Sequence, residues 1–158
     1  MENNMNNLKI FIRQAVSGDL NKILDFQLKM AEETEGLLLP PEKLRPGIEA
    51  ALNDKNKGLY FMAETKGEIA GSLMITREWS DWRNAWVAWI QSVYVRPEFR
   101  RKGIYSALYR HVKALVEKGE YAGIRLYVDK TNTAAQKTYS ALGMNGEHYR
   151  LFEWMKEY

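Results

Sequence analysis

The stretch that decides the fold runs from Ile90 to Ala107 and reads IQSVYVRPEFRRKGIYSA. Its first part is an apolar run of the kind that forms strands, and Pro97 ends that run because proline has no backbone N–H for a strand ladder. A basic turn follows over residues 96–101. Gly103 then opens a predicted helix that extends to about Lys118.

The start of this predicted helix favours an anion. The first turn of a helix exposes unpaired N–H groups and the positive end of the helix dipole. Gly103 has no Cβ, so a ligand can approach the backbone closely there. Arg100, Arg101 and Lys102 add positive charge. The pattern predicts a pyrophosphate-binding turn between a strand and a helix; the alternative is an ordinary basic turn before an amphipathic helix.

Two common phosphate motifs are excluded. The chain contains neither G-x-x-x-x-G-K-[ST] nor G-x-G-x-x-G. The turn therefore belongs neither to a P-loop nor to the dinucleotide-binding fingerprint.

Composition narrows the class of protein. The length of 158 residues predicts one domain over residues 8–158, after a disordered N-terminus at residues 1–7. The chain has no cysteine and only two histidines, so no metal is expected. Its 23 basic residues nearly balance 20 acidic ones, which does not favour a nucleic-acid partner. No apolar run reaches membrane-spanning length, and the polar N-terminus is not a secretory signal. We expect a cytoplasmic protein with no membrane partner.

Apolar periodicity and turn residues predict ten elements in the order β-α-α-β-β-β-α-β-α-β. This order predicts an α/β (α+β) fold with a mixed, mostly antiparallel central sheet and helices on both faces. The predicted strands are Leu8–Arg13, Leu59–Glu64, Ile69–Arg77, Ala85–Val95, Gly123–Val128 and Tyr149–Trp154. The predicted helices begin at Ser17 as N-cap (to about Thr34), Pro41 (to Leu52), Gly103 (to Lys118) and Asn132 (to Leu142, with Gly143 after its end).

A second stretch, TNTAAQKTYSALGM at residues 131–144, carries its own pattern. Asn132, Ala135 and Tyr139 are spaced by three and four residues and so share one face of a helix. Together with R-x-x-G-x at residues 100–104, this stretch resembles motifs A and B of the GNAT N-acetyltransferase superfamily. In that family motif A is Q/R-x-x-G-x-G/A, so Tyr105 departs from its second small position.

The resemblance implies a fold and a co-substrate. In the GNAT fold the strand before motif A and the strand after its helix splay apart, and acetyl-CoA enters the gap. The implied acetyl-CoA-binding residues are Val93, Tyr94, Val95, Arg100, Arg101, Lys102, Gly103, Ile104, Tyr105, Ser106, Asn132 and Ala135. A backbone N–H of Val93–Val95 is the implied oxyanion donor, and Tyr139 is the implied general acid. The alternatives are a buried aromatic at Tyr139 and a plain N-cap at Asn132.

The implied reaction is acetyl transfer from acetyl-CoA to a primary amine of a small molecule or peptide. The positions where relatives carry a base correspond to Trp89 and Gln91, which do not ionise, and no base is assigned. The remaining ionisable candidates are Glu32, Glu33, Glu35, Glu78, Asp81 and His148.

The amine site is expected at a hairpin. Trp79, Asp81 and Trp82 combine aromatic rings with a carboxylate, which suits a cationic amine. The alternative is that the tryptophans pack on the sheet or form a contact in a homodimer, which the sequence leaves open. Two other functions also stay open: a non-catalytic acyl-CoA-binding domain, indicated by Tyr105 and the missing base, and a nucleic-acid-binding α/β domain.

Overall fold

The computed structural model describes residues 8–156 of the chain. The predicted disorder of residues 1–7 lies outside the described residues. The chain forms two compact units, one up to Arg125 and one from Leu126 onward. One domain over residues 8–158 stays a prediction.

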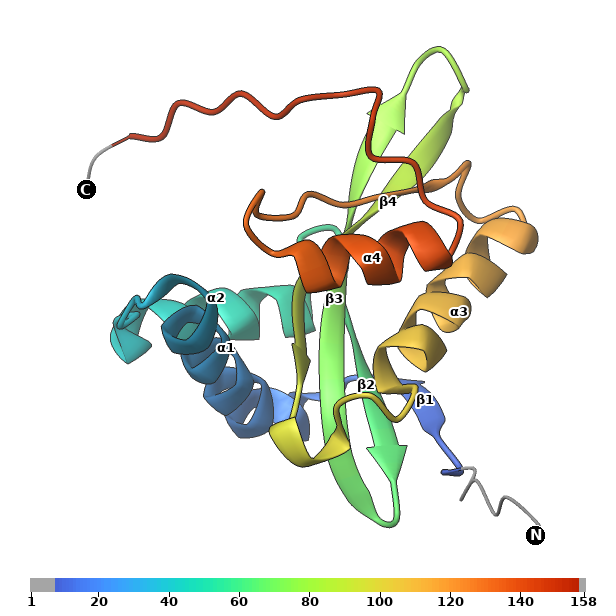
Figure 1. Ribbon diagram of the computed structural model, residues 1–158. Coiled ribbons are helices and arrows are strands. Elements are labelled where there is room, and N and C mark those ends of the chain that lie inside the picture. Colours follow the sequence, from blue (N-terminus) through green and yellow to red (C-terminus); the bar gives the residue numbers. More distant parts are fainter. Residues whose placement is uncertain (1–7, 157–158) are drawn as a thin grey trace, which may run out of the picture. The chain divides into compact units, whose positions relative to one another are not determined.

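The first unit is built on a five-stranded sheet with the strand order β1-β2-β3-β4-β5 (Figure 1). The first four strands pair antiparallel with their neighbours, and β5 pairs parallel with β4. The predicted mixed, mostly antiparallel sheet is therefore confirmed. The strands are β1 (Phe11–Gln14), β2 (Leu59–Thr65), β3 (Glu68–Ser80), β4 (Ala85–Val95) and β5 (Ile124–Arg125).

Two hairpins set the register of the central strands. The turn between β2 and β3 has two residues, Lys66 and Gly67, with positive φ of 53° and 74°. This is the type I′ geometry that matches strand twist. Beyond Ile75, which pairs with Leu59 of β2, strand β3 pairs with β4 alone. The end of the β3–β4 hairpin is therefore a two-stranded arm, visible in Figure 1.

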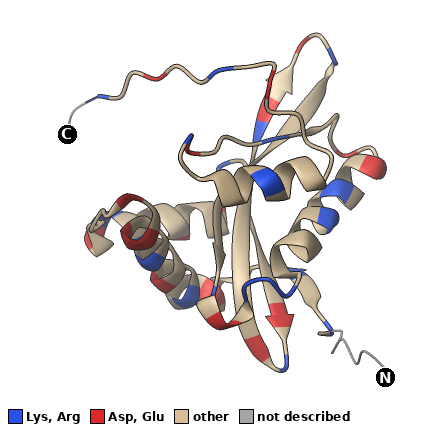
Figure 2. Ribbon diagram, in the orientation of Figure 1, with Lys and Arg blue, Asp and Glu red and all other residues tan. Residues whose placement is uncertain are grey.

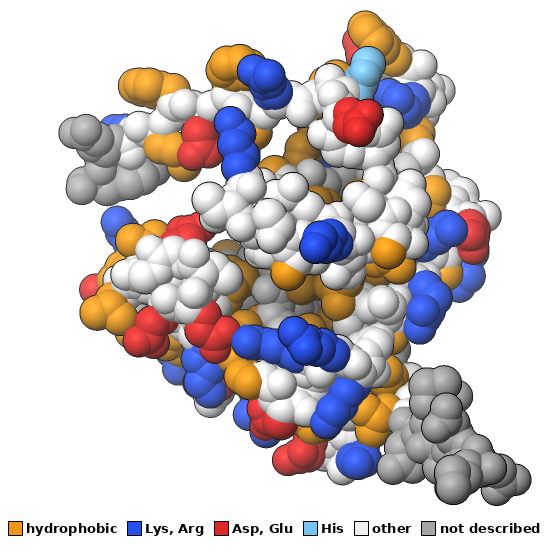
Figure 3. Space-filling model, viewed as in Figure 1, with side chains coloured by type: hydrophobic (Ala, Val, Ile, Leu, Met, Phe, Trp, Pro, Cys, Tyr) orange, Lys and Arg blue, Asp and Glu red, His pale blue; other side chains and the backbone are white. Residues whose placement is uncertain are grey.

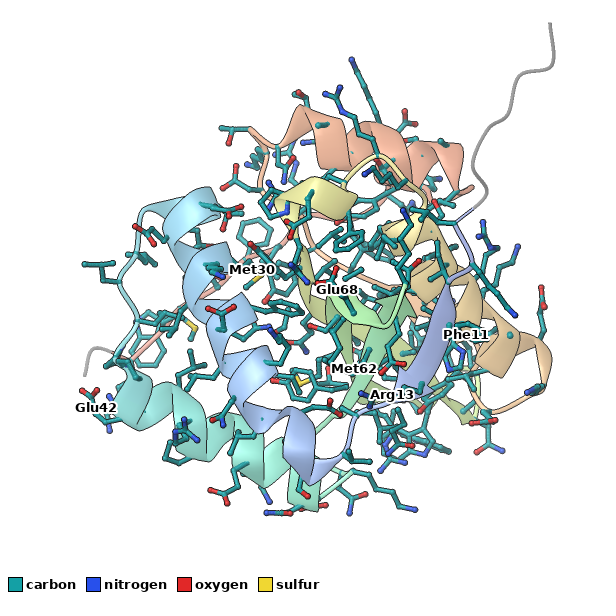
Figure 4. All side chains as sticks on the ribbon, turned by 90° about the horizontal axis from the view of Figure 1, so that it is seen from below. Phe11, Arg13, Met30, Glu42, Met62 and Glu68 are labelled. Carbon is teal, nitrogen blue, oxygen red and sulfur yellow. The ribbon has the colours of Figure 1, made fainter. Side chains whose placement is uncertain are left out.

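Helices cover both faces of this sheet, as predicted. Helices α1 (Leu20–Glu35) and α2 (Pro41–Asn53) lie on one face, and α3 (Ile104–Glu117) lies on the other (Figures 1 and 4). Met62 of β2, labelled in Figure 4, is fully buried in the cluster under α1 and α2. On the opposite face, Phe61 packs against His111 of α3 with ring centroids 4.8 Å apart.

The prediction that Ser17 caps the first helix is wrong. Residues Ser17–Asp19 form a short 3-10 turn, η1, and α1 begins at Leu20. The carboxylate of Asp19 accepts a hydrogen bond from the backbone N–H of Val16 at 2.8 Å. Arg13 holds this carboxylate in place through two further bonds at 2.7 and 2.9 Å. Arg13 of β1, six residues earlier in the chain, therefore holds the residue that precedes α1.

The second unit contains helix α4 (Thr133–Ala141), which ends before Gly143 with φ of 88°. That left-handed glycine is the predicted helix end. The strand predicted at Tyr149–Trp154 is wrong, because these residues join no ladder within residues 8–156. Phe152 and Trp154 are 90% and 89% exposed. The predicted strand at 123–128 is likewise reduced to Ile124–Arg125. A strand exists only where a partner receives its backbone groups, and strand propensity alone does not provide one.

The Arg13–Asp19 pair predicts a specific acid sensitivity. Hydrogen bonds from Arg13 lower the pKa of Asp19, which is buried, below its ordinary value. The stabilisation is therefore fully present above the ordinary pKa of about 3.9 and is lost as pH falls through the lower folded pKa. Asp19→Asn should lower the free energy of unfolding at pH 7 by about 2 kcal/mol and reduce the loss of stability between about pH 5 and pH 2.

Urea unfolding across that pH range checks this prediction. Asp25→Asn is the matched control, because Asp25 pairs with Lys29 on the exposed surface of α1 and should cost less than about 0.5 kcal/mol. An Asp19→Asn variant as stable as the Asp25→Asn variant would show that the buried pair has no such role.

Candidate functional site

The end of β4 has a ladder partner on one side only. Its parallel ladder with β5 covers Ala88 and Trp89 and stops there. Residues 90–95 continue as strand and pair with β3 alone among the described strands. The edge of β4 that faces away from β3 therefore carries backbone groups outside any ladder, beginning just after Trp89.

This same segment contains a β-bulge. Ser72 pairs with Tyr94 and Met74 pairs with Gln91, so β4 has one more residue than β3 across this interval. Ser92 sits in the bulge with φ of 53°, a left-handed conformation that is unfavourable for a residue with a Cβ. A bulge bends its strand and leaves a residue out of the ladder, and such features are frequent beside functional sites.

The turn after β4 has the open geometry that the sequence predicts. A 3-10 turn, η2 (Pro97–Phe99), is anchored by buried Phe99. Arg101 and Gly103 then adopt left-handed φ of 60° and 82°, and Gly103 is the N-cap of α3. Apart from Gly103 and its two chain neighbours, no heavy atom of the described residues lies within 4 Å of the point where a Cβ on Gly103 would stand. The first N–H groups of α3 are thus accessible to an anion approaching Gly103.

The basic residues of the turn differ in what they already bind. Arg96 pairs with Glu98, and Lys102 donates to the carbonyl of Glu98 at 2.7 Å. Arg101 is exposed and makes no hydrogen bond or ion pair with any described residue. Figure 2 shows this turn as a basic segment between β4 and α3, and Figure 3 shows basic side chains gathered there. Arg101 is therefore the basic side chain of the turn with no partner among the described residues, whereas Lys102 has a carbonyl partner but no carboxylate.

The Arg100 side chain is bound to a residue of helix α1. Its guanidinium donates to Glu33 at 2.6 Å and to the carbonyl of Val95 at 2.9 Å. The Tyr94 hydroxyl donates to the same Glu33 carboxylate at 3.2 Å. Burial, reinforced by the charge of Glu33, raises the pKa of Tyr94, so this hydroxyl keeps its proton. Arg100 thus ties the turn to α1, a long-range role that the motif alone does not reveal.

The second predicted constellation lies on α4. The Asn132 side chain accepts a hydrogen bond from the backbone N–H of Ala135 at 3.1 Å, so the N-cap interpretation of Asn132 holds for its oxygen. Tyr139 is half-buried and lies seven residues beyond Asn132. Seven residues are about two helical turns, so both residues lie on one face of α4, together with Ala135.

The three hairpin residues expected at the amine site, Trp79, Asp81 and Trp82, have different surroundings, and their role stays a prediction. Asp81 accepts a hydrogen bond from the backbone N–H of Trp82, and Trp82 is 90% exposed. Trp79 instead packs edge-on against Trp86, with ring centroids 5.1 Å apart. The sequence analysis missed Trp86, although the hairpin register that pairs residue 79 with 86 would have indicated it.

Two of the six candidate bases are carboxylates that already have partners. Glu33 binds Arg100, and Glu78 forms an ion pair with Arg125 across β3 and β5. Gln91, one of the two positions that the sequence analysis matched to a base, donates to the Thr76 hydroxyl. Glu33 and Glu78 therefore each already have a cationic partner.

An apolar cavity of about 360 Å³ lies elsewhere in the first unit. Residues of α2, of the segment before it and of β2 line it, and none comes from β4 or the turn. These residues are Leu39, Pro40, Lys43, Leu44, Gly47, Ile48 and Tyr60. The cavity is thus separate from the basic turn.

Comparison with known proteins identifies relatives of this arrangement. The family model described as "Acetyltransferase (GNAT) family" matches residues 23–144. A crystal structure described as "a possible acetyltransferase from Clostridium difficile 630" has 41% sequence identity and a TM-score of 0.87, covering 94% of this chain and 99% of that one. No curated protein sequence matches the chain.

More distant structures share the fold. An aminoglycoside acetyltransferase from an uncultured soil metagenomic sample, in complex with sisomicin, has 18% identity and a TM-score of 0.74, covering 94% of this chain and 97% of that one. A ribosomal-protein-alanine N-acetyltransferase from Brucella melitensis biovar Abortus 2308 has 15% identity and a TM-score of 0.75, covering 94% and 100%. Within residues 8–156, each helix is too short or too polar to cross a membrane.

Proposed function

The chain belongs to the GNAT family of acetyltransferases, and on that premise we propose that it transfers the acetyl group of acetyl-CoA to a primary amine of a small molecule or peptide. The observation that carries the proposal is the turn from Arg100 to Gly103. It combines an open helix start at Gly103 with an unpaired cation at Arg101. This chemistry fits the pyrophosphate of acetyl-CoA.

The proposal assigns roles to three groups of residues. The backbone N–H groups at the start of α3 and the Arg101 side chain bind the pyrophosphate, with Lys102 and Arg100 shaping the turn. The end of β4 holds the thioester end, and Asn132 and Ala135 on α4 bind the pantetheine. The residues assigned to the first two groups through their backbone are Val93, Tyr94, Val95, Gly103, Ile104, Tyr105 and Ser106.

The chemical step requires few groups from the protein. A neutral amine attacks the thioester carbonyl, and a backbone N–H of Val93–Val95 stabilises the negative charge that develops on the carbonyl oxygen. The C–N bond forms, the C–S bond breaks, and the Tyr139 hydroxyl donates a proton to the departing thiolate. The proton that the amine releases passes to water, since no residue is assigned as the base.

The acceptor is placed at the β3–β4 hairpin. Trp82 offers an exposed ring, and the Asp81 carboxylate lies in the same turn. An aromatic face and a carboxylate attract an ammonium group by cation–π contact and charge. Trp79, whose ring is half-exposed and packs on Trp86, supplies the adjoining apolar surface.

Arg101→Glu tests the pyrophosphate site. Replacing the unpaired cation with an anion should weaken acetyl-CoA binding by at least about tenfold, or 1.4 kcal/mol. Calorimetric titration of acetyl-CoA measures the change. Arg110→Glu is the matched control, because it makes the same change of charge at an exposed position further along α3. Equal losses of affinity in the two variants would reduce the effect to net charge and remove Arg101 from the site.

Tyr139→Phe tests the general acid, because it removes only the hydroxyl. We expect kcat to fall by roughly 10–10³-fold while the acetyl-CoA affinity stays within about threefold. Thiol release from acetyl-CoA, screened across polyamines, amino acids, aminoglycosides and peptides, provides the assay. Tyr121→Phe, at a buried tyrosine of the first unit, is the control. A Tyr139→Phe variant with wild-type kcat, under conditions where chemistry limits the rate, would reject the acid role.

That screen also separates catalysis from the alternative function. If the wild-type protein binds acetyl-CoA but no amine in the screen causes thiol release, the non-catalytic acyl-CoA-binding domain becomes the better account.

Trp82→Ala tests the acceptor site. Loss of a cation–π contact should raise KM for the amine by about threefold to thirtyfold and leave acetyl-CoA affinity unchanged. Phe11→Ala is the control, since Phe11 is also an exposed aromatic but lies on β1 at the far edge of the sheet. Weaker acetyl-CoA binding with unaltered amine kinetics would place Trp82 outside the amine site.

A further inference from the structure

Helix α1 contacts the bulge of β4 through one buried polar side chain. Gln27 is only 4% exposed, and its side-chain amide donates to the backbone carbonyl of Ser92 at 3.3 Å. Burying a side-chain amide costs free energy unless its hydrogen bonds are made. Gln27 therefore binds the one residue of β4 that has left-handed backbone geometry.

The left-handed backbone conformation of Ser92 is strained. Its φ of 53° is unfavourable for a residue with a Cβ, and such conformations persist only where surrounding contacts enforce them. Its position lies outside the parallel ladder with β5, which stops at Trp89. The hydrogen bond from Gln27 is a contact that can enforce the bulge from the α1 side.

The same helix holds the residues that follow the bulge. Phe26 packs against the ring of Tyr94 with centroids 5.0 Å apart. Glu33 accepts a hydrogen bond from Tyr94 and pairs with Arg100. Gln27 acts at the bulge itself, whereas Phe26 and Glu33 act on its C-terminal side.

We infer that Gln27 is a positioning residue that fixes the β4 bulge and thereby aims the backbone N–H groups of Val93–Val95 at the thioester carbonyl. The inference rests on the proposed acetyl transfer. Gln27 does not touch the reacting atoms in this account; it acts through Ser92. Backbone donors stabilise developing charge only when their positions are fixed in advance.

Gln27→Met keeps the length of the side chain and removes its donor. We expect kcat for thiol release, with the best amine of the screen above, to fall by about tenfold or more, while the affinity for acetyl-CoA stays within about threefold. In the unliganded protein, amide hydrogen exchange at residues 92–94 should become at least about tenfold faster.

A second substitution separates positioning from general destabilisation. Glycine adopts left-handed φ without a steric penalty, so Ser92→Gly removes the need for the clamp. The double variant Gln27→Met/Ser92→Gly should recover kcat to within about threefold of Ser92→Gly alone. Ile48→Val is the control for stability, because Ile48 is buried in the α1–α2 cluster on α2 and its loss of a methyl group should leave kcat and exchange at 92–94 unchanged.

Each outcome decides the inference. Unchanged exchange at 92–94 in Gln27→Met overturns it, as does a fall in kcat that Ser92→Gly fails to recover or that Ile48→Val reproduces. If wild-type protein neither binds acetyl-CoA nor releases thiol, the proposed function fails, yet the exchange rates still show whether Gln27 holds the bulge.

Discussion

The first unit depends on the unequal pairing of β4. Along its β3 edge the strand is paired to its end, apart from one bulge, but its parallel ladder with β5 stops at Trp89. Backbone N–H and C=O groups must find partners or remain accessible to solvent and ligands. A strand that is held firmly on one edge and released on the other offers fixed backbone donors to a ligand. Three features lie in or directly after this part of β4, which is paired along one edge only: the bulge at Ser92, the turn at residues 96–103 and the start of α3.

Helix α1 supports this exposed strand end from one face of the sheet. Gln27 binds the bulge, Phe26 packs on Tyr94, and Glu33 collects both the Tyr94 hydroxyl and the Arg100 guanidinium. The Glu33–Arg100 pair is about half-exposed, so its contribution to stability is small, about 0–1 kcal/mol. Its role is geometric, because it fixes Arg100 beside α1, whereas neither Arg101 nor Lys102 pairs with a carboxylate among the described residues.

The sequence predicted those parts of the molecule that local chemistry determines. The end of α4 at Gly143 follows from a residue type at a fixed position. The four central elements from residue 59 to residue 117 follow from apolar periodicity in the same way. The fold class was therefore predictable, as was the open start of α3 at Gly103.

Contacts between distant residues were not predictable in this way. Gln27 and Ser92 are 65 positions apart, and Glu33 and Arg100 are 67 apart, so no local pattern indicates either contact. The prediction of a final strand at residues 149–154 was wrong for a related reason. Residues 149–154 have the apolar and aromatic composition of a strand, but a strand also needs a partner edge, which composition does not encode. Ser17 does not cap the first helix for a different reason: α1 begins at Leu20, and Arg13, six residues before Asp19, holds the Asp19 carboxylate.

The central claim is that the end of β4 and the start of α3 together bind acetyl-CoA through backbone N–H groups. Backbone amide chemical shifts, recorded by NMR during a titration with acetyl-CoA, test it most directly because they report each N–H separately. The account predicts saturable shifts that are largest at residues 93–95 and 103–106. Shifts confined to other parts of the chain, such as the hairpin at residues 81–84 or the lining of the cavity on α2, would contradict it.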